Sequence, residues 1–110
     1  MANEKRSGHG SLTIETDQDR VSWKIVARGE LDLNTAGTLD AELREAEASD
    51  SAQIILDLSA LEFIDSTGLR TVVEASRRAG RDRLGVVRGS GHVAWLMEGT
   101  VLDEIVRFID

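Results

Sequence analysis

Ser66 lies in the stretch of this chain whose residue types and spacing most clearly carry chemistry. The stretch runs from Phe63 to Leu69 and places a hydroxyl where an apolar strand, residues 54–58, gives way to a helix. The first turn of a helix has free backbone N–H groups and the positive end of the helix dipole, which both favour a negative group. The segment therefore suits a phosphorylated serine. Ser, Asp and Thr are also the ordinary N-cap residues, so the alternative is that Ser66 only caps the helix.

The chain offers little for catalysis by its own side chains. Ser66 as a nucleophile would need a base within hydrogen-bond reach, and the two histidines are His9 near the N-terminus and His92 on a late loop. The residues around Ser66 also depart from the Gly-x-Ser-x-Gly nucleophile elbow. With no cysteine and no second histidine at metal-ligand spacing, we expect no enzymatic activity, no metal and no cofactor. If Ser66 is instead a substrate hydroxyl, a partner kinase supplies the ATP, magnesium and base.

Composition narrows the class of protein and of partner. A length of 110 residues suits one domain, and 41% hydrophobic with 30% charged residues is typical of a soluble globular protein without a membrane span. No apolar region follows the Lys5-Arg6 pair, so we expect no secretory signal and a cytoplasmic location. A net charge of −7 argues against binding nucleic acid, which requires a basic surface. We therefore expect the partners to be proteins.

Hydrophobic periodicity before Ser66 predicts a hairpin and a helix. Residues 12–16 and 21–28 alternate apolar with polar side chains around a polar turn, which indicates two antiparallel strands. Thr35 is a candidate N-cap for the helix that follows. The apolar stripe of that helix is formed by Ala36, Leu39, Leu43 and Ala46, and its outer face by Asp40, Glu42, Glu45 and Glu47.

The second half of the chain alternates strands with helices. Residues 54–58 are apolar on both sides, which predicts a central strand covered on both faces or closely approached by helices. A helix follows from Ser66 to about Ala79, then a strand at 84–87 and a helix at about 92–98. The prediction is an α/β domain over residues 11–110, whose mixed sheet opens with an antiparallel hairpin and is flanked by helices. Residues 1–10 lack apolar periodicity and are predicted to be a flexible tail.

The serine segment resembles the phosphorylation motif of STAS domains, particularly the anti-sigma factor antagonists of bacteria. The matching residues are Asp65-Ser66-Thr67-Gly68-Leu69. Gly29-Glu30-Leu31-Asp32, followed by Thr35-Ala36 and Leu39, resembles the loop and helix start that precede this motif in the family. The run from Val93 to Phe108 resembles the last helix and strand. Together these blocks cover roughly residues 11 to 110.

This resemblance implies a STAS-like fold and a regulatory function. In such a protein, the unphosphorylated antagonist binds an anti-sigma factor that is also a serine kinase, and so releases the sigma factor. Phosphorylation of the serine, here Ser66, ends that binding, and a phosphoserine phosphatase restores it. The resemblance also implies a partner-binding surface near Ser66, for which the candidates are Glu30, Asp32, Asp65, Thr67 and Gly68.

Three of these candidates have a structural alternative. Asp32 suits a loop-capping carboxylate equally well, and Glu30 a solvated side chain. Gly68 permits either close approach by a partner or tight packing of the helix. The alternative for the whole chain is a STAS scaffold subunit of a larger stress-signalling or transport assembly, in which Ser66 is a helix cap. The short chain favours the stand-alone antagonist.

Overall fold

The alternating strands and helices form one mixed sheet with helices packed against it. The computed structural model describes residues 3–9 and 11–109. The strands are β1 (Asn3–His9), β2 (Leu12–Gln18), β3 (Ser22–Leu31), β4 (Gln53–Ile64), β5 (Leu84–Val87) and β6 (Arg107–Phe108). The helices are α1 (Ala36–Ala48), α2 (Ser66–Ala79), α3 (Gly91–Leu96) and α4 (Thr100–Ile105). The strands lie in the order β1-β2-β3-β4-β5-β6, with β1, β2 and β3 antiparallel and the following pairs parallel.

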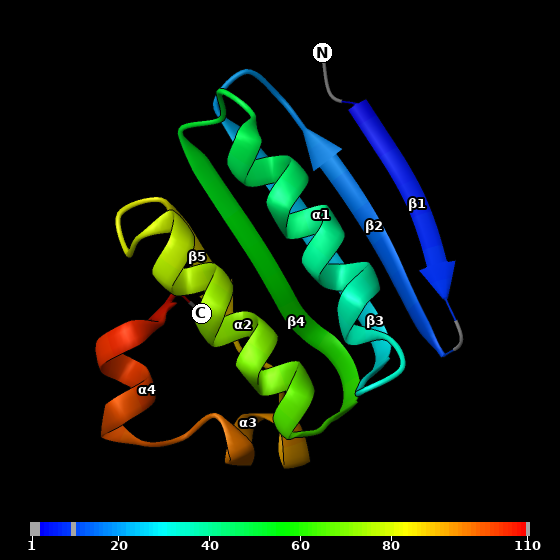
Figure 1. The fold of residues 1–110 in the computed structure, drawn as a ribbon, viewed down its shortest axis with the longest axis vertical. Coiled ribbons are helices and arrows are strands. Elements are labelled where there is room, and N and C mark those ends of the chain that lie inside the picture. Colours follow the sequence, from blue (N-terminus) through cyan, green and yellow to red (C-terminus); the bar gives the residue numbers. More distant parts are fainter. Residues whose placement is uncertain (1–2, 10, 110) are drawn as a thin grey trace.

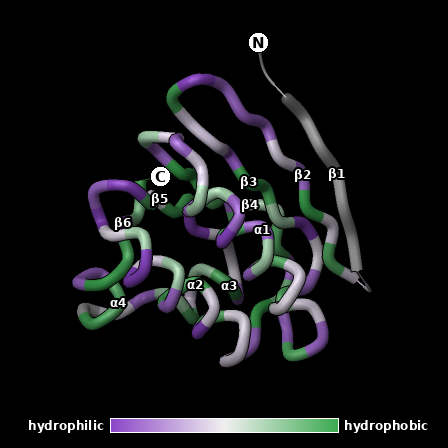
Figure 2. Tube along the Cα trace, turned by 45° about the horizontal axis from the view of Figure 1, so that its top comes forward, coloured by the Kyte–Doolittle hydropathy of each residue, from purple (hydrophilic) through white to green (hydrophobic). Residues whose placement is uncertain are grey.

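The predicted hairpin and the central strand are confirmed. The hairpin is β2 and β3, and Figure 2 shows a hydrophilic stretch at the turn between them. The predicted strand at 54–58 lies within β4, which is paired with β3 on one side and β5 on the other. Helices α1 and α2 lie side by side over one face of the sheet (Figure 1). Ile54, Leu56 and Leu58 are fully buried, whereas Ile55 and Asp57, which point to the other face, are only half-buried.

The structure differs from the sequence analysis at the N-terminus. Residues 3–9, expected to belong to a tail without regular structure, form β1 and pair with β2 from Asn3↔Gln18 to His9↔Leu12. Residues 1, 2 and 10 of the same predicted tail lie outside the described residues. An edge strand offers a row of unpaired backbone groups, so a further strand needs only its own backbone to pair with it. Hydrophobic periodicity does not detect such a strand. The flexibility of this segment stays a prediction.

The apolar stripe predicted for helix α1 is confirmed, but the prediction for the outer face of the helix is wrong at one position. Ala36, Leu39, Leu43 and Ala46 are buried as expected. Glu42 was expected on the solvent face, but it is only 8% exposed. Thr35 occupies the N-cap position, yet its side chain makes no capping hydrogen bond. Its hydroxyl instead donates to the Glu30 carbonyl oxygen at 2.9 Å, which ties the helix start to the end of β3.

The ends of α1 and α2 that lie far from Ser66 are held by two arginines. The Arg83 guanidinium donates to the carbonyl oxygens of a single turn region, those of Ala46, Glu47, Ser49 and Ser51, at 2.9–3.3 Å. Arg78 on α2 pairs with Glu47 at 2.7 Å and with Asp40 at 3.1 Å on α1. The hydrogen bond to Glu47 raises the pKa of Arg78 above its usual range. Burial alone would raise the pKa of Asp40, but Arg44 and Arg78 outweigh it and hold that pKa below 3.8.

The C-terminal segment is more divided than the sequence predicts. The strand at 84–87 is confirmed as β5. A single helix was expected at 92–98, but α3 ends at Leu96 and a separate helix, α4, follows Gly99, whose φ is +139°. Few residues other than glycine adopt that conformation, so Gly99 marks a point where the chain leaves helical geometry. No helix in the described part of the chain is long and apolar enough to cross a membrane.

Candidate functional site: the serine at the start of helix α2

Ser66 is the first residue of α2, as the sequence predicts, and Asp65 links it to the end of β4. It is exposed, and its hydroxyl has no hydrogen bond among the described residues. The structure corrects one alternative, because the N-cap of α2 is Asp65 and not Ser66. A side-chain oxygen of Asp65 accepts from the Gly68 N–H at 2.9 Å. The serine hydroxyl is therefore available, and it makes no capping bond for the helix.

Asp65 also joins the serine segment to the loop after β3. Its second carboxylate oxygen accepts from the Leu33 N–H at 3.0 Å, and its own N–H donates to the Leu31 carbonyl oxygen at 3.1 Å. Both carboxylate oxygens thus accept backbone hydrogen bonds, one from α2 and one from the neighbouring loop. Charge-assisted bonds of this kind are about twice as strong as neutral ones. Asp65 fixes the position of Ser66 relative to residues 31–33.

The loop after β3 is organised by Asp32. One of its carboxylate oxygens accepts from the N–H groups of Asn34 at 3.0 Å and Thr35 at 3.1 Å, an Asx-turn that leads into α1. Its backbone N–H donates to the Thr35 hydroxyl at 2.9 Å. The loop-capping role that the sequence left open for Asp32 is therefore present. Its predicted contact with a partner stays a prediction.

Gly68 is buried where α2 meets the ends of β3 and β4. A Cβ added there would lie 2.6 Å from the Leu31 carbonyl oxygen, 2.8 Å from Leu31 Cγ and 2.9 Å from Ile64 Cγ1. Of the two alternatives for Gly68, the structure shows tight packing of the helix. Thr67 is half-buried, and its carbonyl oxygen accepts from the Thr71 hydroxyl at 3.1 Å.

Glu30 is exposed at the end of β3. One of its carboxylate oxygens accepts from the Ser11 hydroxyl at 2.9 Å. The preceding Gly29 has a φ of +97°, and a Cβ there would lie 2.0 Å from the Ser11 carbonyl oxygen, so only glycine fits. The β3–β4 pairing shifts register between Val26 and Arg28 and again between Gly29 and Glu30. Such bulges re-aim side chains at the end of a strand.

Exposed apolar side chains lie on the loop after β3, near the end of β4 and on α3. Leu33, whose N–H bonds to Asp65, is 73% exposed. Phe63 is exposed as well, and its ring stacks on His92 with centroids 5.5 Å apart. Trp95 lies one turn after His92 on α3 and is 67% exposed. No local pattern distinguishes such residues from core residues, because an exposed Leu or Phe has the same hydropathy as a buried one.

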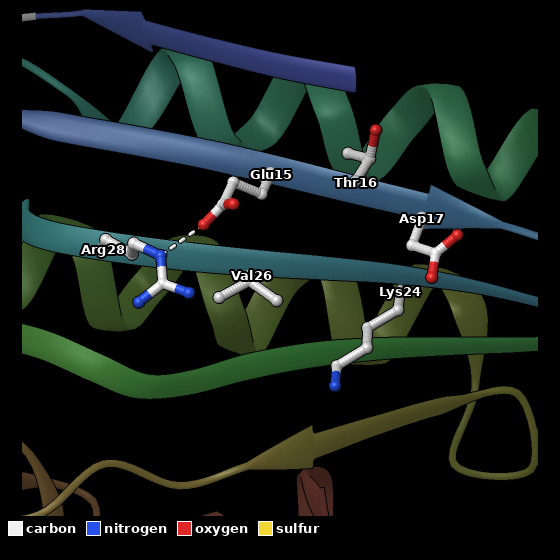
Figure 3. A pocket seen from close by; sticks show the side chains of 6 residues that line it. All are labelled: Glu15, Thr16, Asp17, Lys24, Val26 and Arg28. Atoms are coloured by element: carbon white, nitrogen blue, oxygen red, sulfur yellow. Dashed lines mark hydrogen bonds and ion pairs between the residues drawn. The ribbon is translucent and has the colours of Figure 1, made fainter. Parts of the chain in front are cut away.

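A hollow of about 160 Å³ lies elsewhere, on the face of the sheet opposite α1 and α2. Figure 3 shows Glu15 and Asp17 of β2 beside Lys24, Val26 and Arg28 of β3, with Thr16 pointing away. Arg28 pairs with Glu15, and Lys24 lies 3.9 Å from Asp57. Because Glu15, Lys24 and Arg28 are already paired across the strands, the hollow offers no unpaired cation among its described lining residues for an anionic ligand. Within the described residues, no group of three or more His, Asp or Glu side chains is placed to hold a metal ion.

Comparisons with known proteins agree with this architecture. The family profile described as Mlab, STAS domain matches residues 14–107. The anti-sigma-F factor antagonist RsfB of Mycobacterium tuberculosis is 41% identical over 86 residues, which cover 76% of this chain and 70% of that protein. The crystal structure of an anti-sigma factor antagonist from Mycobacterium paratuberculosis has a TM-score of 0.79 at 26% identity, covering 93% of this chain and 88% of that one. The phosphorylated form of SpoIIAA from Bacillus has the same fold, with a TM-score of 0.67 at 20% identity over 88% of this chain and 91% of that one.

Proposed function

This chain belongs to the STAS-domain family of anti-sigma factor antagonists, and from that premise we propose that it binds an anti-sigma factor serine kinase while Ser66 is unphosphorylated. Binding releases the sigma factor that the kinase holds. Phosphorylation of Ser66 ends the interaction, and a phosphoserine phosphatase restores it. The chain is a regulator and not an enzyme, so the kinase supplies the ATP, the magnesium and the catalytic base.

The exposed hydroxyl of Ser66 is the observation that carries this proposal. It stands at the first position of α2 without a structural partner among the described residues, so a kinase reaches it without unfolding the helix. Asp65 and Asp32 hold the backbone around it in one conformation. A preorganised segment binds with a smaller entropic penalty than a mobile one. SpoIIAA, which shares the fold, has a structure in its phosphorylated form.

The release follows from charge. Phosphate adds about −1.5 to −2 charges at neutral pH. On this protein those charges would appear beside Asp65, whose carboxylate is bonded to the loop that Asp32 organises, at a surface that a partner dehydrates when it binds. Placing like charges together in a dehydrated interface costs several kcal/mol, and each 1.4 kcal/mol is a tenfold change in affinity. Loss of binding upon phosphorylation is therefore the expected outcome.

Incubation with the cognate kinase and ATP, followed by mass spectrometry, tests the modification site. We expect one phosphate on Ser66 and none on Ser66→Ala. Thr67 and Ser59 are the internal controls, because Thr67 is the adjacent hydroxyl and Ser59 is an exposed serine on β4. Stoichiometric phosphate on either of them, with Ser66 unmodified, contradicts the assignment.

Calorimetric titration against the kinase tests the switch. Ser66→Asp should bind at least about a hundredfold more weakly than the wild type, whereas Ser66→Ala should bind normally. Because Asp65 provides the cap, Ser66→Ala should also keep its stability. Ser59→Asp is the matched control, since it adds the same charge within β4. Equal affinity of the wild type and Ser66→Asp would refute release by charge and favour the scaffold alternative.

A further inference from the structure

Arg70 stands one helical turn after Ser66 on α2 and is exposed. Among the residues that the structure describes, it has no ion pair and no hydrogen bond from its side chain. We propose that Arg70 binds the phosphate of phosphorylated Ser66 and so stabilises the phosphorylated form of the protein. This inference rests on the proposed function, because it concerns the phosphorylated serine.

Helix geometry brings the two side chains together. Residues four apart lie on the same face of a helix, and every Cα–Cβ bond tilts toward the helix N-terminus. The Cα–Cβ bond of Arg70 therefore tilts toward the turn that carries Ser66, and the guanidinium can reach it. An acidic group four residues before a basic one is the favoured order for an ion pair within a helix. A phosphoserine at position 66 and Arg70 have this order.

Backbone groups beside Ser66 complete the surroundings of the phosphate. The Gly68 N–H donates to the Asp65 side chain, and the Leu69 N–H donates to the Asp65 carbonyl oxygen. The N–H groups of Ser66 and Thr67 have no acceptor in the described part of the chain. A phosphate at this position would have two backbone donors on one side and the planar guanidinium of Arg70 on the other. Arginine suits this role because its parallel N–H groups match two phosphate oxygens.

The other arginines of α2 show why Arg70 is the one available. Arg78 is committed to Glu47 and Asp40 of α1. Arg77 is exposed but stands near the opposite end of the helix, out of reach of Ser66. The competing partner of Arg70 is Glu74, one turn further along, and the structure shows no ion pair between them. A doubly charged phosphate attracts Arg70 more strongly than a single carboxylate does.

The contact would define the switched-off state. It holds the phosphate against α2, so the modified segment keeps its helical conformation. It also shields the phosphate, so a phosphatase must displace Arg70 before it hydrolyses the ester. Arg70 would thus lengthen the lifetime of the phosphorylated form.

Phosphorus NMR on protein with phosphoserine incorporated at position 66 during translation tests the inference without a kinase. In the wild-type background, the second pKa of the phosphate should be lower by about 0.3 units or more than in Arg70→Gln, which corresponds to a helix pair worth about 0.4 kcal/mol. Arg70→Lys should give an intermediate value. Arg77→Gln is the matched control, because it removes the same charge from the same helix, and it should titrate like the wild type.

Two results would overturn the proposal. One is an identical phosphate titration in the wild type and Arg70→Gln. The other is an equal change in Arg77→Gln, which would mean that only net charge matters. Neither result depends on whether a kinase modifies Ser66 in the cell, so a failure here is distinct from a failure of the proposed function.

Discussion

The two ends of α2 use the same kinds of side chain for different purposes. At the C-terminal end, Arg78 is bonded to carboxylates of α1, and Arg83, which follows the helix, is bonded to carbonyl oxygens at the end of α1 and in the turn after it. At the N-terminal end, Arg70 and the Ser66 hydroxyl have no partner among the described residues. Only Asp65 is committed there, and its bonds go entirely to the backbone.

Polar side chains at the C-terminal end stabilise the fold, whereas those at the N-terminal end are available to a partner. Polar groups that are satisfied within the chain hold elements together and offer little to a partner. Polar groups left unsatisfied at an ordered surface gain their partners only on binding or modification. We therefore expect substitution of the bonded arginines at the C-terminal end of α2 to change stability alone. Substitution of Asp65, at the N-terminal end, should change both stability and binding.

Gly68→Ala should give the largest loss of stability. The new Cβ would meet the Leu31 backbone oxygen and the Ile64 side chain at less than 3.0 Å, so α2 must shift away from the sheet. We expect the free energy of unfolding to fall by about 3 kcal/mol, measured by urea denaturation. Gly37→Ala on α1 is the control, because nothing lies within 4 Å of its Cβ position, and it should gain up to about 1 kcal/mol. A neutral Gly68→Ala would mean that α2 is not held closely at its N-terminal end.

Arg83→Ala tests the region at the C-terminal end of α2, where the side chains are expected to contribute only to stability. Removing the guanidinium takes its hydrogen bonds from the carbonyl oxygens of Glu47, Ser49 and Ser51. The Ala46 carbonyl oxygen keeps its bonds from Ser49. We expect a loss of about 2 kcal/mol in the free energy of unfolding, with unchanged affinity for the anti-sigma partner. Arg77→Ala, an exposed arginine nearby, should change neither quantity. Weaker partner binding by folded Arg83→Ala would break the distinction between the two ends.

Asp65→Ala tests the other end. The variant loses the cap of α2 and the bond to the Leu33 N–H, and we expect a loss of about 1 to 2 kcal/mol. Affinity for the anti-sigma partner should fall as well, because Ser66 is no longer fixed relative to the loop after β3. Asp65→Asn should lose less stability, because its amide oxygen still accepts one of the two bonds. Normal binding by both variants would show that this positioning is not needed.

The smallest effect concerns acid stability at the C-terminal end. Because folding lowers the pKa of Asp40, its contribution is fully present above the usual value of 3.8 and is lost as the pH falls through the lower value of the folded state. Near neutral pH, the free energy of unfolding of the wild type should exceed that of Asp40→Asn by less than about 1 kcal/mol, because the ion pairs of Asp40 are partly exposed. That difference should shrink from about pH 4 downward in urea denaturation. Asp50→Asn is the control, because it changes an exposed carboxylate and should show no such trend with pH. If the difference in stability between the wild type and Asp40→Asn stays constant with pH, the ion pairs are not its cause.

The local parts of this protein follow from the sequence by itself. Alternating hydropathy identifies β2 and β3, and the stripe of Ala36, Leu39, Leu43 and Ala46 identifies the buried side of α1. The start of α2 at Ser66 is equally local. These features depend on residues within one or two turns of each other, and a hydrophobic period of two or 3.6 residues records them directly.

Only the tertiary structure decided which residue caps α2 and which hydroxyl stays available at the site. The sequence offers several possible capping residues at 65–67. In the structure, Asp65 caps α2 and also accepts a hydrogen bond from the Leu33 N–H of another segment, so Ser66 is left available. The same holds for the stacking of Phe63 on His92 and the burial of Glu42. Each of these depends on contacts between segments distant in the chain, set by the shifted register of β3 on β4 and the packing of helices on the sheet. Hydrophobic periodicity determines which face of an element is buried, but it carries no information about which neighbour that face will meet.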